Sequence, residues 1–520
     1  MKKQEIKKWI MAMAILSLTI SLGACGQTTG TTSQKSTEVE ISVSDSSQEN
    51  TAEESTEDIQ NKDGEAIESD GKQMPPDGER PGDPPDKPDG ERPGDPPDGE
   101  GGGTPPGGFG GGGFGGGSSA DVDYNAATEI TAADAQTGKS YESSTADESA
   151  LLISTTDSVT ITDVTVKKTG DSDGGDNCNF YGLNAAVLVK DGATATITGA
   201  TITSDADGAN GVFSYGGNGG KNGAAGDGTT VIISDSAITT TGDGSGGIMT
   251  TGGGVTKASN LTVTTSGRSS AAIRTDRGGG TVIVDGGTYT TNGLGSPAIY
   301  STADVTVSNA TLVSNLSEGT CIEGKNSITL INCNLTANNT KRNGNAKFLD
   351  SIMIYQSMSG DADSGTSSFN VMGGTLTSKS GHIFHVTNTN AIINLSDVKI
   401  VNEDSANVLL SVCNDGWSGA SNVATLNADG QELSGNILVG SNSTLTLNLK
   451  NGSSFSGSIS GNITNAAGDV VSTETGTVAI SIDADSTWTL TADSYVTSIE
   501  GSMDNVNTNG YVLYVNGVAQ

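Results

Sequence analysis

Positive charge, aromatic side chains and proline are scarce in most of this sequence, and each shortage excludes a class of protein. The 520 residues include 26 Lys and Arg against 61 Asp and Glu, which gives a formal net charge of −35. A chain this negative is repelled by phosphate backbones and by anionic lipid, so we expect no nucleic-acid partner and no electrostatic docking on a membrane. Aromatic residues make up 4% of the chain, too few for the cores of several ordinary α/β or helical domains.

Catalytic and metal-binding motifs are also missing. The chain has neither a G-x-S-x-G nucleophile elbow nor a phosphate-binding P-loop. Its two histidines, His382 and His385, lie three residues apart in a segment that reads as strand or bend, and no third ligand accompanies them. We therefore expect no zinc site at these residues, and we assign no catalytic residue.

The cysteines show no C-x-x-C spacing, which argues against a redox or zinc motif. Four of the five lie in the body of the chain, and these are Cys178, Cys321, Cys333 and Cys413. Outside the cytoplasm they could form disulfides, with Cys321 and Cys333 one strand apart. Small buried thiols are nevertheless the favoured interpretation.

Long hydrophobic runs are absent except near the start of the chain. Four lysines precede an apolar stretch at 9–22, which at about 14 residues is too short to span a bilayer permanently. The stretch ends in Leu22-Gly23-Ala24-Cys25, which resembles the bacterial lipobox. That resemblance implies that residues 1–25 are a lipoprotein signal peptide and that Cys25 is diacylated. We expect a protein anchored to the bacterial cell membrane by two acyl chains, outside the cytoplasm and exposed at the cell surface.

Residues 26–120 concentrate the unusual composition. Eleven of the 12 prolines lie at 75–106, and an 11-residue acidic repeat occurs at 76–86 and again at 88–98. The segment holds 21 acidic and 6 basic residues, a net charge of −15. Such a segment buries too little apolar surface to fold. We predict a disordered, acidic Pro/Gly-rich stalk that lifts the body away from the membrane, since Pro-rich chain favours extended polyproline II.

From residue 121 onward, one six-residue pattern recurs eight times. An apolar residue comes first and sixth, and the third residue tolerates left-handed backbone angles. The third residues are Asp163, Gly199, Asp235, Gly286, Asn309, Asn332, Gly373 and Asp397. Each copy predicts two short strands joined by a tight bend, with the flanking apolar side chains pointing inward.

A further strand precedes most copies of the pattern and repeats at a regular spacing. The steps from Ile248 through Ile273 and Ile299 to Ile322 are 25, 26 and 23 residues. Three short strands in each period of 20-odd residues, with one fixed bend and one variable loop, indicate a solenoid.

These features resemble the right-handed parallel β-helices of the pectate-lyase-like superfamily. Within it, the chain is most similar to clostridial carbohydrate-binding and adhesin-like β-helix surface lipoproteins. We therefore predict an all-β fold, a single right-handed parallel β-helix over 121–520, with the clearest periodicity at 125–460. A C-terminal cap is expected at about 460–520, with Trp488, Tyr511 and Tyr514 as candidates for it. The superfamily includes lyases, hydrolases, binding proteins and adhesins, so the resemblance specifies fold better than function.

One strand of each coil carries the candidate binding residues. If Ile273, Ile299 and Ile322 point inward, the residues after them point outward. This places Arg274, Tyr300 and Glu323 on an exposed stripe that Tyr355 and His385 continue. In the resembled superfamily this strand forms the floor of the saccharide cleft.

Two nearby cations join the candidate carbohydrate-binding set, Arg277 and Lys325. A guanidinium clamps a carboxylate in bidentate fashion, and in lyases of this fold an Arg or Lys abstracts a proton next to a calcium-polarised uronate. The alternative is that Arg274 and Arg277 form surface salt bridges with Asp276, Glu323 or loop acids. We favour that alternative over catalysis, but not over binding.

Calcium is the expected cofactor. Two loops bunch carboxylates with glycine, as an oxygen-rich calcium site requires, although neither matches an EF-hand. The candidate ligands are Asp171, Asp173, Asp176, Asp205 and Asp207. Solvated acidic turns explain the same residues almost equally well.

Together these observations predict a monomeric cell-surface lipoprotein whose β-helix binds a polysaccharide or cell-wall glycan, with calcium and without catalysis. The glycan would be of the pectin or uronate type, or cellulosic. A pectate-lyase-like lyase and an adhesive or structural protein without glycan activity are the alternatives. The acidic body fits poorly with an acidic glycan, so either calcium or a neutral glycan must resolve that conflict.

Overall fold

The computed structural model describes residues 122–172, 174–219, 225–417 and 421–520. Contacts divide the chain into two units, Met1–Pro97 and Asp98–Gln520, and every described residue belongs to the second. The predicted signal peptide with Cys25, the predicted stalk and Asp173 lie outside the described residues.

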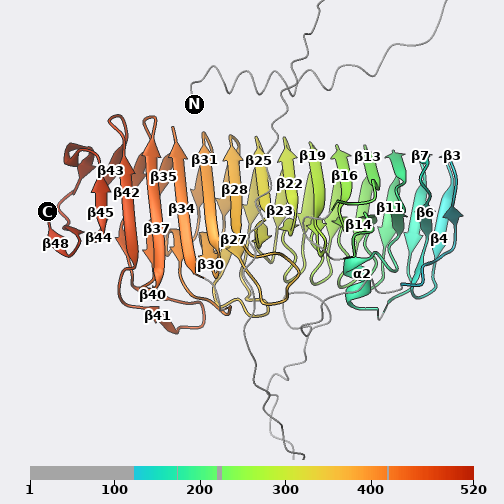
Figure 1. Cartoon of the computed structure of the whole chain (residues 1–520), viewed down its shortest axis with the longest axis horizontal. Helices are drawn as coiled ribbons and strands as arrows, with labels where there is room; N and C mark the ends of the chain where they lie inside the picture. Colours follow the sequence, from blue (N-terminus) through green and yellow to red (C-terminus); the bar gives the residue numbers. More distant parts are fainter. Residues whose placement is uncertain (1–121, 173, 220–224, 418–420) are drawn as a thin grey trace, which may run out of the picture. The chain divides into compact units, whose positions relative to one another are not determined.

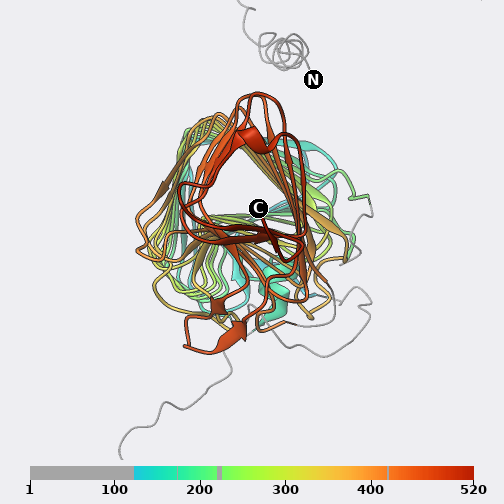
Figure 2. The same ribbon diagram turned by 90° about the vertical axis from the view of Figure 1, so that its left-hand side faces the viewer.

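The described residues form a parallel β-helix, which confirms the predicted all-β fold class (Figure 1). A 14-stranded sheet runs from β3 (Asp134–Thr137) to β45 (Ser498–Glu500), and a 13-stranded sheet runs from β2 (Glu129–Ile130) to β39 (Ile459–Ser460). A 10-stranded sheet runs from β4 (Ser140–Ser143) to β32 (Lys399–Asn402). Within each of these sheets a strand pairs in parallel with its counterpart in the next coil. Figure 2, a view from the end of the stack, shows the coils superimposed around a common interior.

One coil shows how the recurring pattern folds. The bend residue Gly199 follows strand β10 (Thr194–Thr198) of the 14-stranded sheet and leads to β11 (Thr201–Ser204) of the 10-stranded sheet. A loop then leads to β12 (Val212–Tyr215) of the 13-stranded sheet. All eight predicted bend residues have positive φ, so the predicted bends are confirmed. Asn260 and Gly430 form further bends with positive φ, which the pattern missed because a small residue, Ala258 or Ala428, begins each of these copies.

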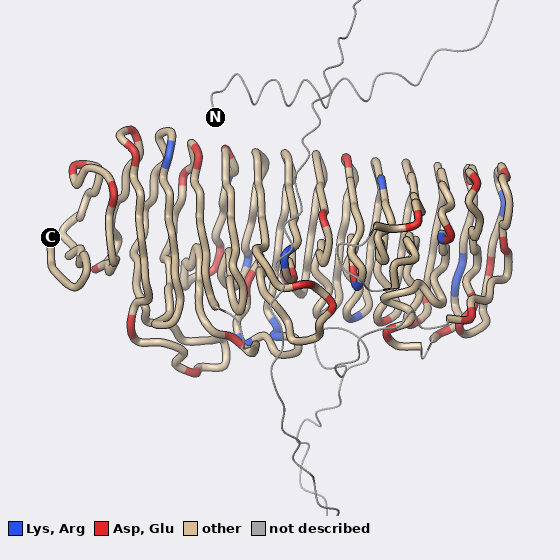
Figure 3. The backbone as a smooth tube through the Cα atoms, in the orientation of Figure 1, with Lys and Arg blue, Asp and Glu red and all other residues tan. Residues whose placement is uncertain are grey.

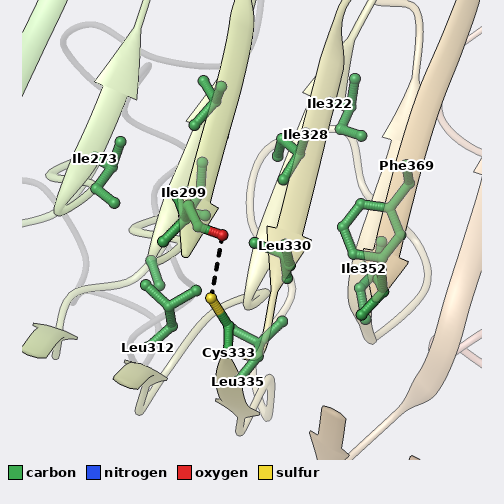
Figure 4. Close-up of a cluster of buried hydrophobic side chains, with 14 of the residues drawn as sticks. Ile273, Ile299, Leu312, Ile322, Ile328, Leu330, Cys333, Leu335, Ile352 and Phe369 are labelled. Carbon is green, nitrogen blue, oxygen red and sulfur yellow. Dashed lines mark hydrogen bonds between the residues drawn. The ribbon is translucent and has the colours of Figure 1, made fainter. Parts of the chain in front are cut away.

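The interior is a continuous stack of aliphatic side chains. Figure 4 shows a section in which Ile299, Leu312, Leu330 and Leu335 point toward one another from the surrounding strands. Each side chain lies over its counterpart one coil away, at the roughly 4.8 Å spacing of paired strands. Full burial of one such side chain stabilises the fold by about 1.5–3 kcal/mol, which explains how a chain with few aromatics holds together.

A second stack, made of hydrogen-bonded asparagines, lies on the outer face of the 14-stranded sheet. Asn394 Nδ2 donates to Asn370 Oδ1 at 2.7 Å, and Asn427 Nδ2 donates to Asn394 Oδ1 at 2.8 Å. Asn448 repeats the contact with Asn427 at 2.8 Å. The four lie on β28 (Thr366–Met372), β31 (Asn390–Ser396), β34 (Asn422–Asp429) and β37 (Ser443–Lys450), where equal spacing lets Asn394 and Asn427 each use both a donor and an acceptor.

Strands continue beyond residue 460, where the sequence pattern fades. Strand β42 (Thr477–Ile482) extends the 14-stranded sheet, and β43 (Thr487–Thr489) belongs to a 4-stranded sheet with β35 (Glu432–Ser434), β38 (Ser454–Ser456) and β46 (Val506–Asn507). Trp488 is fully buried; its ring stacks on Phe455 with centroids 5.9 Å apart, and its indole N–H donates to the Gly457 carbonyl at 3.0 Å. Trp488 is therefore part of the interior stack.

Candidate functional sites

The outer face of the 13-stranded sheet carries the predicted stripe. Its strands here are β15 (Ile248–Thr251), β18 (Ile273–Thr275), β21 (Ile299–Ser301), β24 (Thr320–Glu323), β27 (Asp350–Tyr355), β30 (His382–Thr387) and β33 (Val408–Val412). Strand pairing aligns one outward-facing residue from each, and these are Met249, Arg274, Tyr300, Cys321, Met353, His385 and Ser411.

The prediction that this stripe is exposed is wrong. Arg274 is 6% exposed, Tyr300 is 9% exposed and Glu323 is 2% exposed, while Tyr355 and His385 are fully buried. The reason is that loops fold back over the sheet and bring their own apolar side chains. Around Tyr300 and Tyr355, the covering side chains include Ala346 and Trp417, so this face has become a second core outside the coil.

The register also differs from the prediction at Glu323. Ile299 pairs with Thr320 and Ser301 pairs with Ile322, so Glu323 aligns with Tyr355 rather than with Tyr300. A threonine occupies the inward position opposite Ile299, and a pattern based on apolar residues passes over it. Glu323 still meets the stripe through its side chain.

Glu323 lies at the centre of a buried hydrogen-bond network. The Tyr300 and Tyr355 hydroxyls donate to Oε2 of Glu323, at 2.5 Å and 3.0 Å, and the Ser357 hydroxyl donates to Oε1. The Tyr355 ring packs against Trp417 with centroids 4.9 Å apart. Burial raises the pKa of Glu323 and outweighs these donors, which favour the carboxylate. The network holds the covering loops in place.

The two candidate arginines are held by acids. Arg274 Nη2 donates to Asp276 Oδ2 at 2.8 Å, and both side chains are buried. Burial raises the pKa of Asp276 to about 7, although Arg274 opposes that change. Arg277 donates to Asp361 at 2.6 Å and lies 4.0 Å from the centroid of the Phe180 ring. Asp276 and a loop acid are the partners that the salt-bridge alternative expected, but the pair of Arg274 and Asp276 is buried rather than at the surface.

Lys325 is the exposed member of the candidate set. Its ammonium lies 2.8 Å from Asp363 Oδ2, and both side chains are about half exposed. Figure 3 shows how sparse Lys and Arg are along the coils. Whether Arg277 or Lys325 contacts a glycan stays a prediction.

Both histidines join a buried cluster that the sequence did not reveal. The Ser411 hydroxyl lies 2.8 Å from Nδ1 of His382 and 2.8 Å from Nδ1 of His385. His385 Nε2 lies 3.3 Å from Asp415 Oδ2, and Phe348 stacks on the His385 ring. Ser, His and Asp together are the groups of a hydrolytic triad, but Ser411 is fully buried and shared between two imidazoles. An attacking hydroxyl must reach a substrate, so we assign this cluster a structural role.

Three of the predicted calcium ligands accept hydrogen bonds from a neighbouring coil. Asp171 Oδ1 accepts from the Asp207 N–H at 2.9 Å, and Asp207 Oδ1 accepts from the Asp243 N–H at 2.7 Å. Asp205 accepts from the Thr241 hydroxyl at 2.5 Å, and Asp176 lies exposed in α2 (Asp176–Phe180). Among the residues that the structure describes, no three His, Cys, Asp or Glu side chains gather where they could hold a metal. Calcium binding stays a prediction.

The four cysteines of the body are buried, as the favoured interpretation predicted, and Cys321, Cys333 and Cys413 are free thiols. Cys333 lies against the interior stack, where its thiol donates to the Val307 carbonyl at 3.3 Å (Figure 4). Cys321 lies on the outer face, so the two thiols that are close in sequence point to opposite sides of the coil wall.

An open groove of about 480 Å³ lies near the C-terminal end of the described chain. It is lined by residues of β44 (Ser494–Val496), by the segments 460–462 and 473–476, and by the turn after β47 (Leu513–Val515). Tyr495, 40% exposed, stacks almost parallel on Tyr514 with centroids 4.9 Å apart. Exposed Asn462, Glu474 and Asn516 line the same groove. No sequence motif pointed to this groove, and of its two tyrosines only Tyr514 was a candidate residue, for the C-terminal cap.

The chain matches no protein-family model, no curated protein and no solved structure. Among its described residues, no helix is long and apolar enough to cross a membrane. The resemblance to the pectate-lyase-like superfamily therefore stays a prediction beyond the parallel β-helix itself.

Proposed function

We propose that this protein is a non-catalytic, polysaccharide-binding protein of the cell surface, and that its C-terminal groove binds a neutral glycan. The observation that carries the proposal is the exposed Tyr495 ring, which Tyr514 supports from one side. A sugar ring places its C–H face on such a platform, while amide and hydroxyl groups bond its rim. Asn462, Thr473 and Asn516 supply those groups in this groove.

The charge of the groove favours a neutral glycan over a uronate. Glu474 is the sole charged residue among the residues that line it, and no Lys or Arg lines it. A uronate carboxylate would lie near Glu474 without a counter-charge, whereas a neutral sugar would use Glu474 as a hydrogen-bond acceptor. A cellulosic or other neutral polymer therefore resolves the conflict between an acidic protein and its ligand.

The lyase alternative finds no support in the candidate bases. Arg274, Arg277 and Lys325 each contact a carboxylate, and Arg274 is buried. We expect no unsaturated uronate product when the protein is incubated with polygalacturonate and calcium.

The test is retention of the full chain on insoluble cellulose and titration with neutral oligosaccharides, followed by calorimetry. Replacement of Tyr495 by Ala should weaken binding at least tenfold, about 1.4 kcal/mol. Tyr511→Ala is the matched control, since Tyr511 is equally exposed but does not line the groove. Equal affinity of the two variants, or calcium-dependent binding of polygalacturonate alone, would contradict the proposal.

We also propose that Cys25 is lipidated and holds the protein on the outer side of the cell membrane. Support comes from the resemblance of Leu22-Gly23-Ala24-Cys25 to a lipobox. Cys25→Ala should abolish incorporation of labelled palmitate and should release the chain into the medium. Continued labelling of that variant would contradict the anchor.

A further inference from the structure

A second, smaller hollow lies beside the C-terminal groove. Its volume is about 270 Å³, and its lining residues are Ser441, Val470, Val471, Ser472, Thr473 and Glu474. Thr473 and Glu474, both exposed, also line the groove that contains Tyr495. The two hollows are therefore adjacent, and the segment 473–474 is their common wall.

The smaller hollow follows one strand of a hairpin. Strands β40 (Ile463–Thr464) and β41 (Val470–Ser472) pair antiparallel and project from the coils near the C-terminal end (Figure 1). The segments 460–462 and 473–476, which line the groove, form the base of this hairpin. A ligand chain that leaves the groove over Glu474 therefore reaches β41.

Contacts with an earlier loop hold this hairpin in place. Ile463 is buried in one cluster with Phe348, and the Ala466 N–H donates to the Lys347 carbonyl at 2.9 Å. Asn465 closes the turn, since its Oδ1 accepts two backbone N–H groups of the turn at 2.9 Å and 3.0 Å. A surface that is formed before the ligand arrives loses less conformational entropy on binding.

One buried hydroxyl fixes the common wall of the two hollows. Ser472 Oγ donates to the Glu474 carbonyl at 2.9 Å and accepts from the Ser441 N–H at 3.0 Å. Ser441 lies in the turn between β36 (Asn436–Val439) and β37, so this hydroxyl joins the hairpin to the body of the β-helix. The position of Glu474 between the hollows is therefore set by the fold.

The lining of the smaller hollow has the chemistry that a neutral sugar needs. Val470 is 68% exposed, more than any other large hydrophobic side chain among the described residues. The exposed side chains of Ser441 and Thr473 supply hydroxyl groups, and Glu474 supplies an acceptor. No Lys or Arg lines this hollow, so a uronate would find no counter-charge here either.

We propose that the smaller hollow is a second subsite, so that one glycan chain runs from the Tyr495 ring over Glu474 to Val470. This inference rests on the proposed binding of a neutral glycan in the C-terminal groove. It makes the ligand a polymer held across both hollows rather than a free sugar. Glu474 then accepts hydrogen bonds from the sugars on either side of it.

Two adjacent subsites should make the affinity depend on the length of the chain. A sugar that enters the second hollow is already tethered to the sugar in the first, so its binding is intramolecular. Short ligands reach one hollow, and longer ligands reach both. We therefore expect the affinity to rise at least tenfold once the chain is long enough to cross Glu474.

The probes are cello-oligosaccharides and manno-oligosaccharides of two to six sugars, and the protein is the full chain. Calorimetry should show an affinity for the hexasaccharide of one series at least tenfold above that for its disaccharide. A longer chain also gains from the larger number of registers in which it can bind. That gain is only a few-fold, so a tenfold rise reports a second contact.

Two variants separate the subsites on the protein side. Val470→Ser should weaken hexasaccharide binding at least tenfold and leave disaccharide binding unchanged, whereas Tyr495→Ala should weaken both. Ile283→Ser is the matched control, since Ile283 is an exposed strand residue on β19 (Gly280–Asp285) and lines neither hollow. Because Val470 is mostly exposed, the thermal midpoint of Val470→Ser should stay within a few degrees of that of the unaltered chain.

The length series on the unaltered chain keeps the inference falsifiable if Val470→Ser fails to fold. Binding of the disaccharide and the hexasaccharide with similar affinity would overturn the second subsite and leave the proposed function standing. Equal loss of both ligands in Val470→Ser would also overturn it, because the two hollows would then act as one site. Failure of both series to bind at any length would contradict the proposed function and the second subsite with it.

Discussion

The carboxamide of Gln431 bonds both backbone polar groups of Val398, one coil earlier, with its oxygen at 2.9 Å and its nitrogen at 2.7 Å. Both residues are almost completely buried. In the 10-stranded sheet, backbone hydrogen bonds join each coil to the next. At this position a side chain replaces them, because β32 and β35 of the next coil are not paired. Gln431 therefore joins the two coils at the end of the unpaired segment that lies next to the 14-stranded sheet.

Replacement of Gln431 by Met should destabilise the fold by about 2–4 kcal/mol, because the buried N–H and C=O of Val398 lose their partners. Met has a similar length and is apolar, so the loss reports the hydrogen bonds rather than a cavity. The urea midpoint of the full chain measures the effect. Gln520→Met is the control, since Gln520 is exposed, and an equal midpoint for both variants would show that the bonds contribute nothing.

Alanine variants at two glycines with similar φ can distinguish the cost of backbone strain from the cost of a steric clash. Gly374 has φ of +79°, and a Cβ atom there would lie 2.0 Å from the Cys333 carbonyl oxygen. Gly430 has φ of +61°, but its nearest atom would be 3.7 Å away. Gly430→Ala should cost about 1 kcal/mol, the left-handed penalty, and Gly374→Ala at least about 2 kcal/mol more. Thermal unfolding of both variants measures the difference, and equal losses would contradict the close approach.

The repeat itself could be predicted because it depends on short-range rules. Asp163, Asn309 and Asn332 revealed bends because few residues other than glycine adopt left-handed angles easily. Ile273 and Ile299 revealed the inward face because every coil needs an apolar residue there. These signals recur at each turn, so errors at one coil do not accumulate.

The site residues could not be predicted because they depend on loops and on register. Tyr300 was expected to be exposed, but it belongs to a buried cluster with Trp417, which comes from a loop more than a hundred residues later. Glu323 was misaligned because the inward residue opposite Ile299 is Thr320, which no apolar pattern detects. The missing pairing between β32 and β35 could not be predicted, because Leu433 in β35 is still a buried apolar residue at the inward position that the pattern expects.

The cysteines give a direct test of the buried outer core. Burial raises the pKa of the thiols of Cys321, Cys333 and Cys413, which lowers the thiolate fraction as well as access. In a Cys25→Ser chain, Ellman's reagent should find no fast-reacting thiol in the native state and four thiols in denaturant. Fewer than four after denaturation would indicate a disulfide, and a fast native reaction would contradict the covering loops.

Asp276 should make the stability of this protein depend on pH. Burial raises its pKa in the folded state to about 7, against an ordinary value of 3.8. Between these values the folded state keeps a proton that the unfolded state has released. Stability from this group is therefore complete below about pH 4 and is lost as the pH rises toward 7. The difference of about three units between the folded and unfolded pKa of Asp276 corresponds to about 4 kcal/mol in the free energy of unfolding.

Asp276→Asn removes this titration but keeps an oxygen that can accept from Arg274. We expect the urea midpoint of the unaltered chain to fall more steeply between pH 5 and pH 7 than that of the variant. Glu323, whose pKa burial also raises, is present in both chains, so the difference in slope isolates Asp276. A lower limit of pH 5 keeps the chain above its isoelectric point of about 4.1, where self-association would interfere. Parallel curves, or a midpoint that rises with pH only in the unaltered chain, would show that Arg274 holds Asp276 ionised throughout this range.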